Sequence, residues 1–244
     1  MKLRIHAVAF WLGASLLLCG CQNMNELRAE LARTPGLAPA MAGHVAAGTV
    51  ALNEIPMYGE HLGHVKTPAM VKADEEYLAR ADRSYPSRTE AAKASIETGW
   101  KYFNKGDYST AIKRFNQAWL LNPENGDSYY GFALVSAQRN DPSEVIDDYF
   151  KMALSKPGVN VAAQVDYGRF LWTIGRYDES LANLHAALEK NPRAYNARAH
   201  ISFVHYRRGN FEHACRWAID ARENGDFLEP GYQENMCRKA GKES

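Results

Sequence analysis

The sequence predicts an all-α protein in which about four helix-turn-helix repeats stack into a superhelical array with flanking capping helices. A unit of about thirty-four residues recurs between Ala92 and Glu223. Small and large side chains occupy fixed places in it, as two closely packed antiparallel helices require. Glycine and proline separate the units. Two copies 69 residues apart share Gly99, Tyr102, Gly106, Tyr108, Ala111, Phe115, Ala118 and Pro123 in one, and Gly168, Leu171, Gly175, Tyr177, Ser180, Leu184, Ala187 and Pro192 in the other.

Capping and helix-breaking residues predict where the repeat helices begin and end. The stretch from Asp141 to Glu144 predicts a helix start, because aspartate caps, proline suits the first helical position and glutamate completes a capping box. Pro157 and Pro192 end helices, since proline cannot continue the backbone hydrogen bonds. The four repeats are expected to occupy residues 92–224, with the first helix beginning slightly earlier. The expected helix pairs are 89–104 with 108–121, 126–139 with 142–155, 160–173 with 177–190, and 194–207 with 211–223.

Two flanking segments are expected to cap the array, because a stack of repeats exposes apolar surface at its ends. In residues 67–91, Thr67 as cap and Pro68 at the first helical position predict a helix to about Arg83. In residues 225–244, the stretch from Pro230 to Ala240 predicts a last, more polar helix. The side chains of the first segment expected to face the array are Met70, Val71, Tyr77, Leu78 and Ala81.

The N-terminal residues have the features of an export signal. Lys2 and Arg4 precede an apolar run that is too short for a comfortable membrane span. The run ends in Leu-Cys-Gly-Cys at positions 18–21, which resembles the lipobox of bacterial lipoproteins. That resemblance implies cleavage of residues 1–20 as a signal peptide and a lipid on Cys21, while Gln22 favours the outer membrane, facing the periplasm, over the inner membrane. An ordinary secretory signal and an uncleaved anchor are the alternatives.

Residues 21–66 are expected to form a flexible tether from the lipid to the repeats. The stretch from Thr34 to Thr49 is rich in Ala, Gly and Pro and holds little large apolar material, so it cannot bury enough surface to offset the cost of ordering. The stretch from Ile55 to Gly59 is an apolar island with turn residues, which we expect to dock on the repeats.

Charge and cysteine content agree with an exported, membrane-tethered protein. The formal net charge of +1 becomes −1 when residues 1–20 and their two cations are removed, so no general attraction to nucleic acid is expected. Cys215 and Cys237 are then the two remaining thiols, and an oxidising compartment favours a disulfide between them. Such a bond is expected to stabilise the fold by about 3 kcal/mol. Two buried free cysteines are the alternative.

The repeat pattern resembles that of the tetratricopeptide repeat family, whose small, Tyr, Gly-Asp-Tyr, Ala, Phe, Ala, Pro series is nearly complete in the first copy. The resemblance implies that the first helix of each pair lines a concave groove with its second, fifth, ninth, twelfth and thirteenth residues. Ala92, Gly126, Val161 and Tyr195 are the first positions of the units. The expected groove residues are Trp100, Phe103, Asn104, Tyr130, Leu134, Gln138, Arg169, Trp172, Phe203, Tyr206 and Arg207.

Tryptophan, tyrosine and arginine dominate interface energies, so this groove is expected to bind a protein or peptide partner. Apolar side chains with a carboxylate or a few acidic residues would suit it. Family members that clamp a C-terminal carboxylate carry Lys and Asn where this chain has Ile96 and Trp100, so that clamp is expected to be absent. The alternative is that the segment from Ile55 to Arg83 fills the groove itself.

The sequence gives little support for catalysis, and we expect no cofactor and no catalytic residue. It contains no glycine-rich phosphate loop, no Gly-x-Ser-x-Gly turn and no Cys-x-x-Cys pair. His61 and His64, with His44 upstream, lack the spacing of a zinc-binding helix. The adjacent carboxylates Asp147 and Asp148 are expected on an exposed helix face, pointing about 100° apart.

These observations predict a non-catalytic adaptor or assembly factor, anchored in the cell envelope by lipid. Three alternatives remain open: an accessory lipoprotein of type IV or related pilus or secretion assembly, a self-assembling structural envelope protein, and a metalloenzyme using His61 and His64. The partner, the pathway and the oligomeric state do not follow from the sequence.

Overall fold

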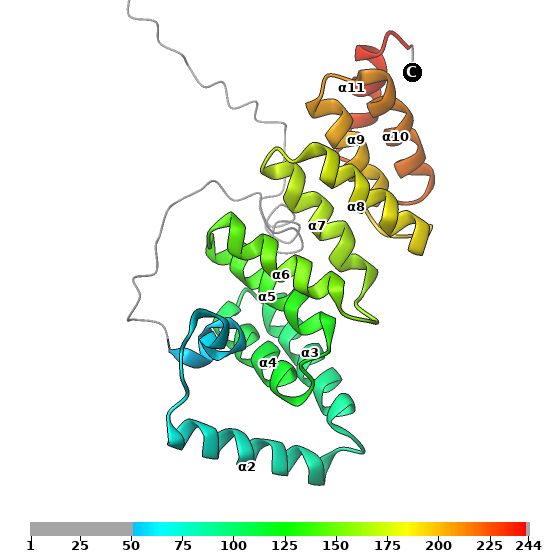
Figure 1. The fold of residues 1–244 in the computed structure, drawn as a ribbon. Helices are drawn as coiled ribbons and strands as arrows, with labels where there is room; N and C mark the ends of the chain where they lie inside the picture. The colour runs from blue at the N-terminus through cyan, green and yellow to red at the C-terminus, as the bar shows by residue number, and fades with distance from the viewer. Residues whose placement is uncertain (1–50, 243–244) are drawn as a thin grey trace, which may run out of the picture.

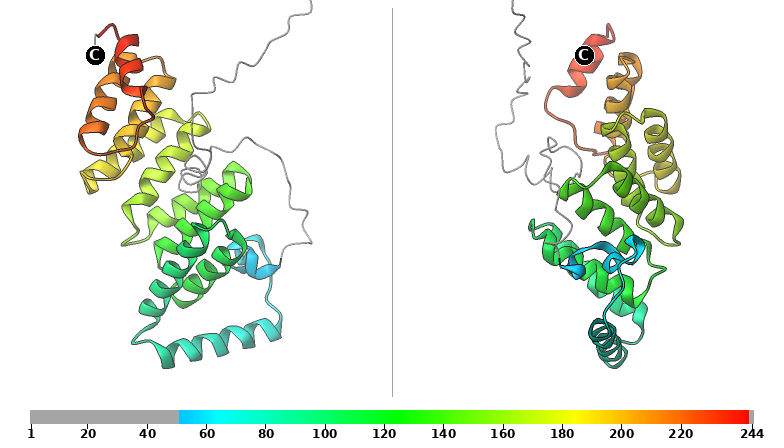
Figure 2. Two further views of the ribbon diagram at one scale, coloured as in Figure 1. Left: turned by 180° about the vertical axis from the view of Figure 1, so that it is seen from behind. Right: turned by 60° about the vertical axis from the view of Figure 1, so that its left-hand side comes forward.

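A computed structural model describes residues 51–242 and shows an array of stacked helix pairs (Figure 1). The elongated array winds from the first pair to the last (Figure 2). The predicted all-α superhelical fold is therefore confirmed. The antiparallel pairs are α3 (Arg88–Phe103) with α4 (Tyr108–Leu121), α5 (Gly126–Arg139) with α6 (Ser143–Ser155), α7 (Val161–Thr173) with α8 (Tyr177–Lys190), and α9 (Ala197–Arg207) with α10 (Phe211–Glu223).

Glycines in the first helices let a buried phenylalanine pack against two helices at once. A Cβ placed on Gly99 of α3 would lie 2.6 Å from Phe115 Cε1, and one placed on Gly131 of α5 would lie 2.6 Å from Phe115 Cδ1. The same arrangement recurs in the third pair, where a Cβ on Gly168 would lie 2.7 Å from Leu184 Cγ. The repeated glycine is therefore required by close approach of the neighbouring side chain.

A buried polar network joins α6, α7 and α8. The Asp147 carboxylate accepts hydrogen bonds from the Tyr167 hydroxyl at 2.7 Å and from Arg176 Nη1 at 2.8 Å, and it pairs with Lys151 Nζ at 2.6 Å. Burial raises the pKa of Asp147, but these three hydrogen bonds outweigh it and hold the pKa below its ordinary value. The expectation that Asp147 is exposed was wrong, because Tyr167 and Arg176 of the next repeat cover its carboxylate.

Two predicted helix starts differ from the structure. Asp141 does not cap α6: Pro142 precedes the helix, and the Asp141 side chain hydrogen-bonds to Ser136 instead. The last pair begins at Ala197 rather than at residue 194, because Asn196 adopts a left-handed conformation with φ of 63°. Asp226, from beyond α10, accepts hydrogen bonds from the backbone N–H groups at the start of α9, including that of Arg198 at 3.0 Å. A distant carboxylate thus caps this helix.

Two short 3₁₀ segments, η1 (Leu52–Glu54) and η2 (Pro56–Leu62), pack on α4. Asn116 Nδ2 of α4 donates to the backbone oxygens of Asn53 and Ile55 at 2.9 and 2.8 Å, and Met57 and Tyr58 are buried. Residues 51–62 therefore pack on the array, as expected for the Ile55–Gly59 island, although the sequence placed them within the 21–66 tether. Residues 1–50, which include the predicted signal peptide, Cys21, Gln22 and His44, lie outside the described residues.

Helix α2 (Pro68–Ser84) touches the array mainly through its C-terminal half and extends across the first pair (Figure 1). The Thr67 hydroxyl accepts a hydrogen bond from the Met70 N–H at 3.3 Å, which is the predicted cap. Ala81 is buried, and Tyr77 and Leu78 pack against α3 and α4 residues beside it. Val71 is 43% exposed, so the expectation that it faces the array was wrong.

The last helix, α11 (Tyr232–Lys239), packs on α10. It starts after Gly231, which has a left-handed φ of 78°. Cys237 of α11 is joined to Cys215 of α10 with an S–S distance of 1.99 Å. Between residues 51 and 242, no helix combines the length and apolar character needed to cross a bilayer.

We predict that Gly131→Ala lowers the free energy of unfolding by about 1–2 kcal/mol. The added methyl group overlaps the Phe115 ring, and overpacking of this kind costs more than the roughly 1 kcal/mol gained in helix propensity. Urea denaturation of the variant measures the loss. In a Phe115→Leu background the loss should shrink, because the smaller side chain leaves room. An equal loss in both backgrounds would contradict this packing account.

Candidate functional site

The candidate site is the face formed by the first helices of the pairs, α3, α5, α7 and α9, which we call the groove. These helices lie next to one another through side-chain contacts. The Trp100 ring of α3 lies 5.0 Å from the Tyr130 ring of α5, and the Trp172 ring of α7 lies 6.1 Å from the Phe203 ring of α9. The Tyr130 hydroxyl donates to the Asp166 carboxylate, which connects α5 to α7. Side-chain contacts therefore join the four first helices in sequence, from α3 to α9.

Some predicted groove residues are packing residues of the array. Phe103, Tyr130 and Leu134 are buried in the main hydrophobic core, and Arg169 is fully buried as well. The expectation that these four side chains contact a partner is corrected accordingly: they fill the space between neighbouring helices. The half-buried or exposed members of the predicted set are Trp100, Asn104, Gln138, Trp172, Phe203, Tyr206 and Arg207.

Of the four half-buried aromatic residues in the predicted set, Trp172, Phe203 and Tyr206 lie at the C-terminal end of the groove. Trp172 stacks on Phe203, and the Phe203 ring lies 4.6 Å from the Tyr232 ring of α11. Tyr206 also contacts Tyr232, and Arg207 beside it is exposed. Helix α11 therefore forms part of this surface. Sequence reasoning missed Tyr232, although its place one helix beyond the last repeat was a usable signal.

Segment 52–66 does not run along the groove. Its polar contacts are with α4, the second helix of the first pair, with α2, and with Arg139 at the end of α5. The Glu54 carboxylate pairs with Lys113 of α4 at 2.8 Å, and the Glu54 backbone oxygen accepts from Arg139 Nη1 at 2.6 Å. Lys66 pairs with Asp74 of α2 at 2.8 Å. The described residues of segment 52–66 therefore do not fill the groove, and α2 reaches it only at the first repeat, where Ala81 packs in one buried cluster with Ile96 of α3.

A polar cluster that the sequence reasoning missed lies between α7 and α9, in the C-terminal half of the groove. Asp166 and His200 occupy the same place in the third and fourth units, 34 residues apart, beside the buried Arg169. Burial raises the pKa of the Asp166 carboxyl, and the Arg169 guanidinium opposes this rise. Burial, with a smaller contribution from Arg169, lowers the pKa of His200 well below its ordinary value. His200 is therefore neutral at pH 7. The sequence could have indicated this cluster, because Asp166 and His200 are ionisable residues at the same position of successive repeats.

Two polar atoms in this cluster lack a hydrogen-bond partner among the described residues. They are Trp172 Nε1, a donor, and His200 Nδ1, and both are buried. The Trp172 and His200 rings are neighbours, with centroids 6.4 Å apart. Buried polar atoms of this kind are usually satisfied by an ordered water, so a water bridging the two rings would account for both atoms.

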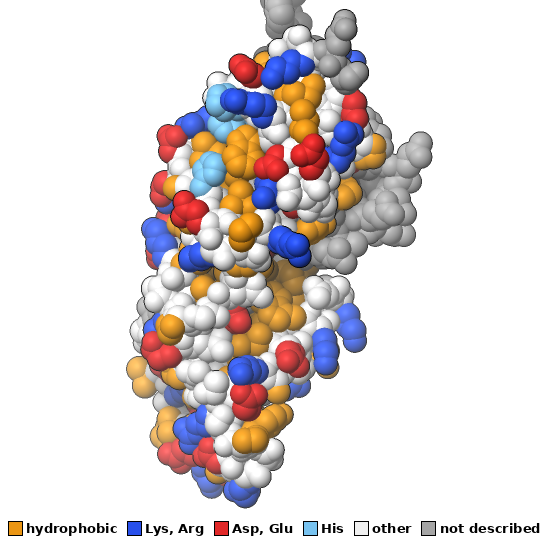
Figure 3. All heavy atoms as spheres, turned by 90° about the vertical axis from the view of Figure 1, so that its right-hand side faces the viewer, with side chains coloured by type: hydrophobic (Ala, Val, Ile, Leu, Met, Phe, Trp, Pro, Cys, Tyr) orange, Lys and Arg blue, Asp and Glu red, His pale blue; other side chains and the backbone are white. Residues whose placement is uncertain are grey.

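The histidines do not form a metal centre in the part of the chain that the structure describes. His64 is exposed, and no group of three or more His, Cys, Asp or Glu residues with metal-binding geometry occurs within residues 51–242. His205 stacks on His213 with ring centroids 4.9 Å apart, in the C-terminal half of the array. Figure 3 shows histidines on that half and basic and acidic side chains interspersed over the same face.

Comparisons with known proteins agree with this architecture. A family model described as tetratricopeptide repeat matches residues 96–160 and 166–226, together just over half of the chain. The type IV pilus assembly protein PilF of Pseudomonas aeruginosa is 28% identical over 97 residues, which cover 40% of this chain and 38% of that protein. Stress-induced-phosphoprotein 1 of Caenorhabditis elegans is 29% identical over 97 residues, covering 38% of this chain and 30% of that protein.

The matched stretch spans only about a third of the length of these curated relatives. Among solved structures, that of Pseudomonas aeruginosa PilF superposes with a TM-score of 0.58 at 20% identity, over 63% of this chain and 71% of that one. At this identity the likeness shows the fold alone.

We predict that His200 makes the fold less stable in mild acid. Its folded pKa lies below the unfolded value of 6.5, so its contribution to stability is present above pH 6.5 and is lost as the pH falls further. Between pH 7.5 and 5.5 this group should remove about 1.4 kcal/mol from the free energy of unfolding. The His200→Gln variant should lose correspondingly less over that range in urea denaturation. An identical pH dependence in both proteins would contradict the assignment.

Proposed function

Because the chain belongs to the tetratricopeptide repeat family, we propose that it is a non-catalytic adaptor that holds a protein or peptide partner in its groove. The observation that carries the proposal is the surface formed by Trp172, Phe203, Tyr206 and Arg207. These side chains combine the part-accessible rings of three half-buried aromatic residues with one exposed cation. Aromatic rings and arginine are the side chains that contribute most to interface affinity.

The groove suits a segment with apolar side chains and at least one carboxylate. Trp172 and Phe203 offer stacked rings for apolar contact, and Arg207 offers a guanidinium for a carboxylate. Ile96 and Trp100 occupy the places where related proteins carry a carboxylate clamp, so recognition of a chain terminus at the first repeat is not part of the proposal. The partner's acidic group would lie at the C-terminal end of the groove.

We place the protein in the cell envelope, as a lipoprotein anchored through Cys21 in the outer membrane and facing the periplasm. The lipobox-like residues 18–21 support this proposal. The disulfide between Cys215 and Cys237 supports it as well, because such bonds persist in oxidising compartments. A partner protein in the same compartment follows from this location.

The anchor is tested by growing the source cells with radioactive palmitate. The wild-type chain should be labelled and should fractionate with membranes, whereas Cys21→Ala should carry no label and should be released by washing. Cys19→Ala is the matched control and should be labelled normally. A wild-type chain that stays with the membranes but carries no palmitate label would contradict the lipoprotein proposal.

A role in type IV pilus or related secretion assembly is the second candidate. The relative with 28% identity is by name a type IV pilus assembly protein, and its solved structure shares the fold. Loss of pili in a deletion strain would favour this pathway. A structural role through self-assembly is the third candidate. A monomer at all concentrations in light scattering would remove it.

The adaptor proposal predicts that two single substitutions weaken the envelope partner that co-purifies with the wild-type chain. Trp172→Ala and Arg207→Ala should each reduce affinity at least tenfold, since each removes a large contact or a charge-assisted hydrogen bond. Arg222→Ala, an exposed arginine on α10, is the matched control and should bind normally. Circular dichroism checks that all three variants stay folded. Unchanged binding by both groove variants would show that the partner docks elsewhere.

A further inference from the structure

We propose that a second binding site lies between α2 and the first helix pair, and that it takes an extended acidic peptide segment of a partner protein. Two adjoining hollows of about 270 and 410 Å³ separate α2 from α3 and α4. Their linings share Tyr77, Arg80, Arg114 and Gln117, so they form one cleft. The cleft lies outside the groove, because the α3 residues that line it are not groove positions of the repeat. They are Ala91, Ala94, Ser95 and Thr98.

The cleft exists because α2 is attached at only part of its length. Ala81 is buried against the first pair, and the Tyr77 hydroxyl lies 3.4 Å from Ser95 Oγ of α3. At the other end of the helix, the array-side lining is Asn53, Tyr58 and Lys113, with Met70 on α2 opposite them. A helix that bridges across the array in this way leaves a slot beneath it.

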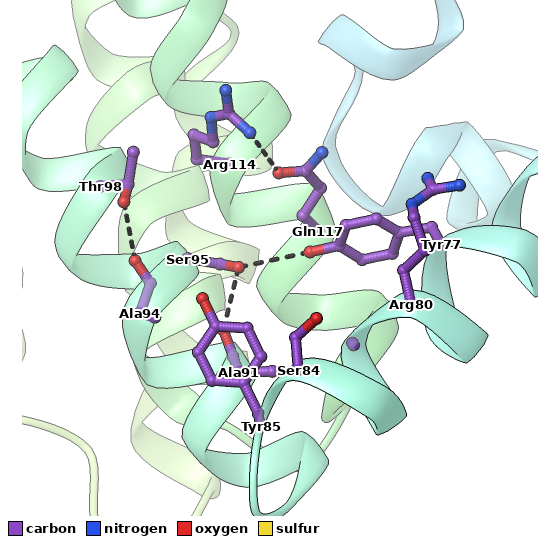
Figure 4. A pocket seen from close by; sticks show the side chains of 11 residues that line it. Tyr77, Arg80, Ser84, Tyr85, Ala91, Ala94, Ser95, Thr98, Arg114 and Gln117 are labelled. Carbon is purple, nitrogen blue, oxygen red and sulfur yellow. Dashed lines mark hydrogen bonds between the residues drawn. The ribbon is translucent and has the colours of Figure 1, made fainter.

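The cleft carries two arginines that lack an acidic partner. Figure 4 shows Arg114 and Gln117 of α4 on one side and Arg80 and Tyr77 of α2 on the other. Arg114 Nη1 donates to Gln117 Oε1 at 2.9 Å, while its Nε is buried without an acceptor in the described residues. Between residues 51 and 242, neither Arg80 nor Arg114 forms an ion pair with a carboxylate.

The other charges that line the cleft are already neutralised. The carboxylate in the lining, Asp74, pairs with Lys66 at 2.8 Å, and Lys66 also pairs with Glu60, outside the lining, at 3.0 Å. Lys113 in the lining pairs with Glu54 at 2.8 Å. The cleft therefore keeps two uncompensated guanidinium groups, and an arginine fork matches the two oxygens of a carboxylate. Charge complementarity thus selects an acidic occupant.

The dimensions and the remaining lining favour a peptide strand. The cleft follows α2 from Met70 to Tyr85, which is about 22 Å at the helical rise per residue. About six residues of extended chain span that length. The Ser84 hydroxyl and the Gln117 amide nitrogen are polar groups of the lining that can hydrogen-bond to a peptide backbone. Met70 and Tyr58 at one end offer an apolar contact for a side chain.

The test is fluorescence anisotropy with the full chain and a panel of fluorescein-labelled hexapeptides. Each peptide carries two or three Glu or Asp residues and one Leu, and each has a partner peptide in which Gln and Asn replace the acids. At least one acidic peptide should bind, its amide counterpart should not, and salt should weaken the binding. Arg80→Ala and Arg114→Gln should each reduce affinity at least tenfold, while Arg83→Ala, on α2 but outside the lining, should not.

Several outcomes would overturn the proposal. One is that no acidic peptide binds below about 1 mM, the weak end of specific recognition. A second is that Arg207→Ala and Trp172→Ala reduce peptide affinity as much as Arg80→Ala does, because the peptide would then lie in the groove. A third is that anionic phospholipid vesicles, but no peptides, bind through Arg80 and Arg114. If Arg114→Gln unfolds, Arg80→Ala still decides the question, because Arg80 lines the cleft from α2 while its side chain stays exposed, so the substitution removes no core contact.

Discussion

The close approach of neighbouring helices at glycine is the interaction on which the array depends. Phe115 of α4 contacts Gly99 and Gly131 at distances that leave no room for a Cβ on either helix, so one ring joins two repeats. Ser202 plays a related part in the last repeat, where its hydroxyl donates to the Ala214 backbone oxygen at 2.7 Å. Because each contact joins only neighbouring units, the groove keeps its curvature through a chain of such local contacts.

The same packing decides which groove positions remain for a partner. Large side chains at the first two repeats turn into the core, as Phe103 and Leu134 do, and contribute stability instead of recognition. At the last two repeats Trp172 and Phe203 stack on each other and leave part of their surface accessible. These part-accessible rings lie next to α11, which the disulfide joins to α10 and which adds Tyr232 to the same face.

Local sequence signals predicted the repeat helices well, whereas they could not predict contacts between residues far apart in the sequence. The bounds of α4, α5, α8 and α10 agree with the sequence expectation, because repeat register, caps and breakers act within a few residues. The start of α9 was missed, since the residue that caps it, Asp226, lies about thirty positions downstream. Burial of Asp147 and Arg169 was missed for a similar reason: only the stacked array brings their neighbours close. The cleft beneath α2 likewise follows from where that helix lies.

Photocrosslinking in living cells from a photoreactive residue at position 207 tests the central claim most directly. Arg207 is exposed at the end of the groove, and Glu189, exposed on the outer helix α8, is the matched control position. The account predicts one dominant envelope protein crosslinked from position 207 and absent from position 189. Crosslinking of the same protein from position 189 alone, or equally from both positions, would contradict the claim that the groove holds the partner.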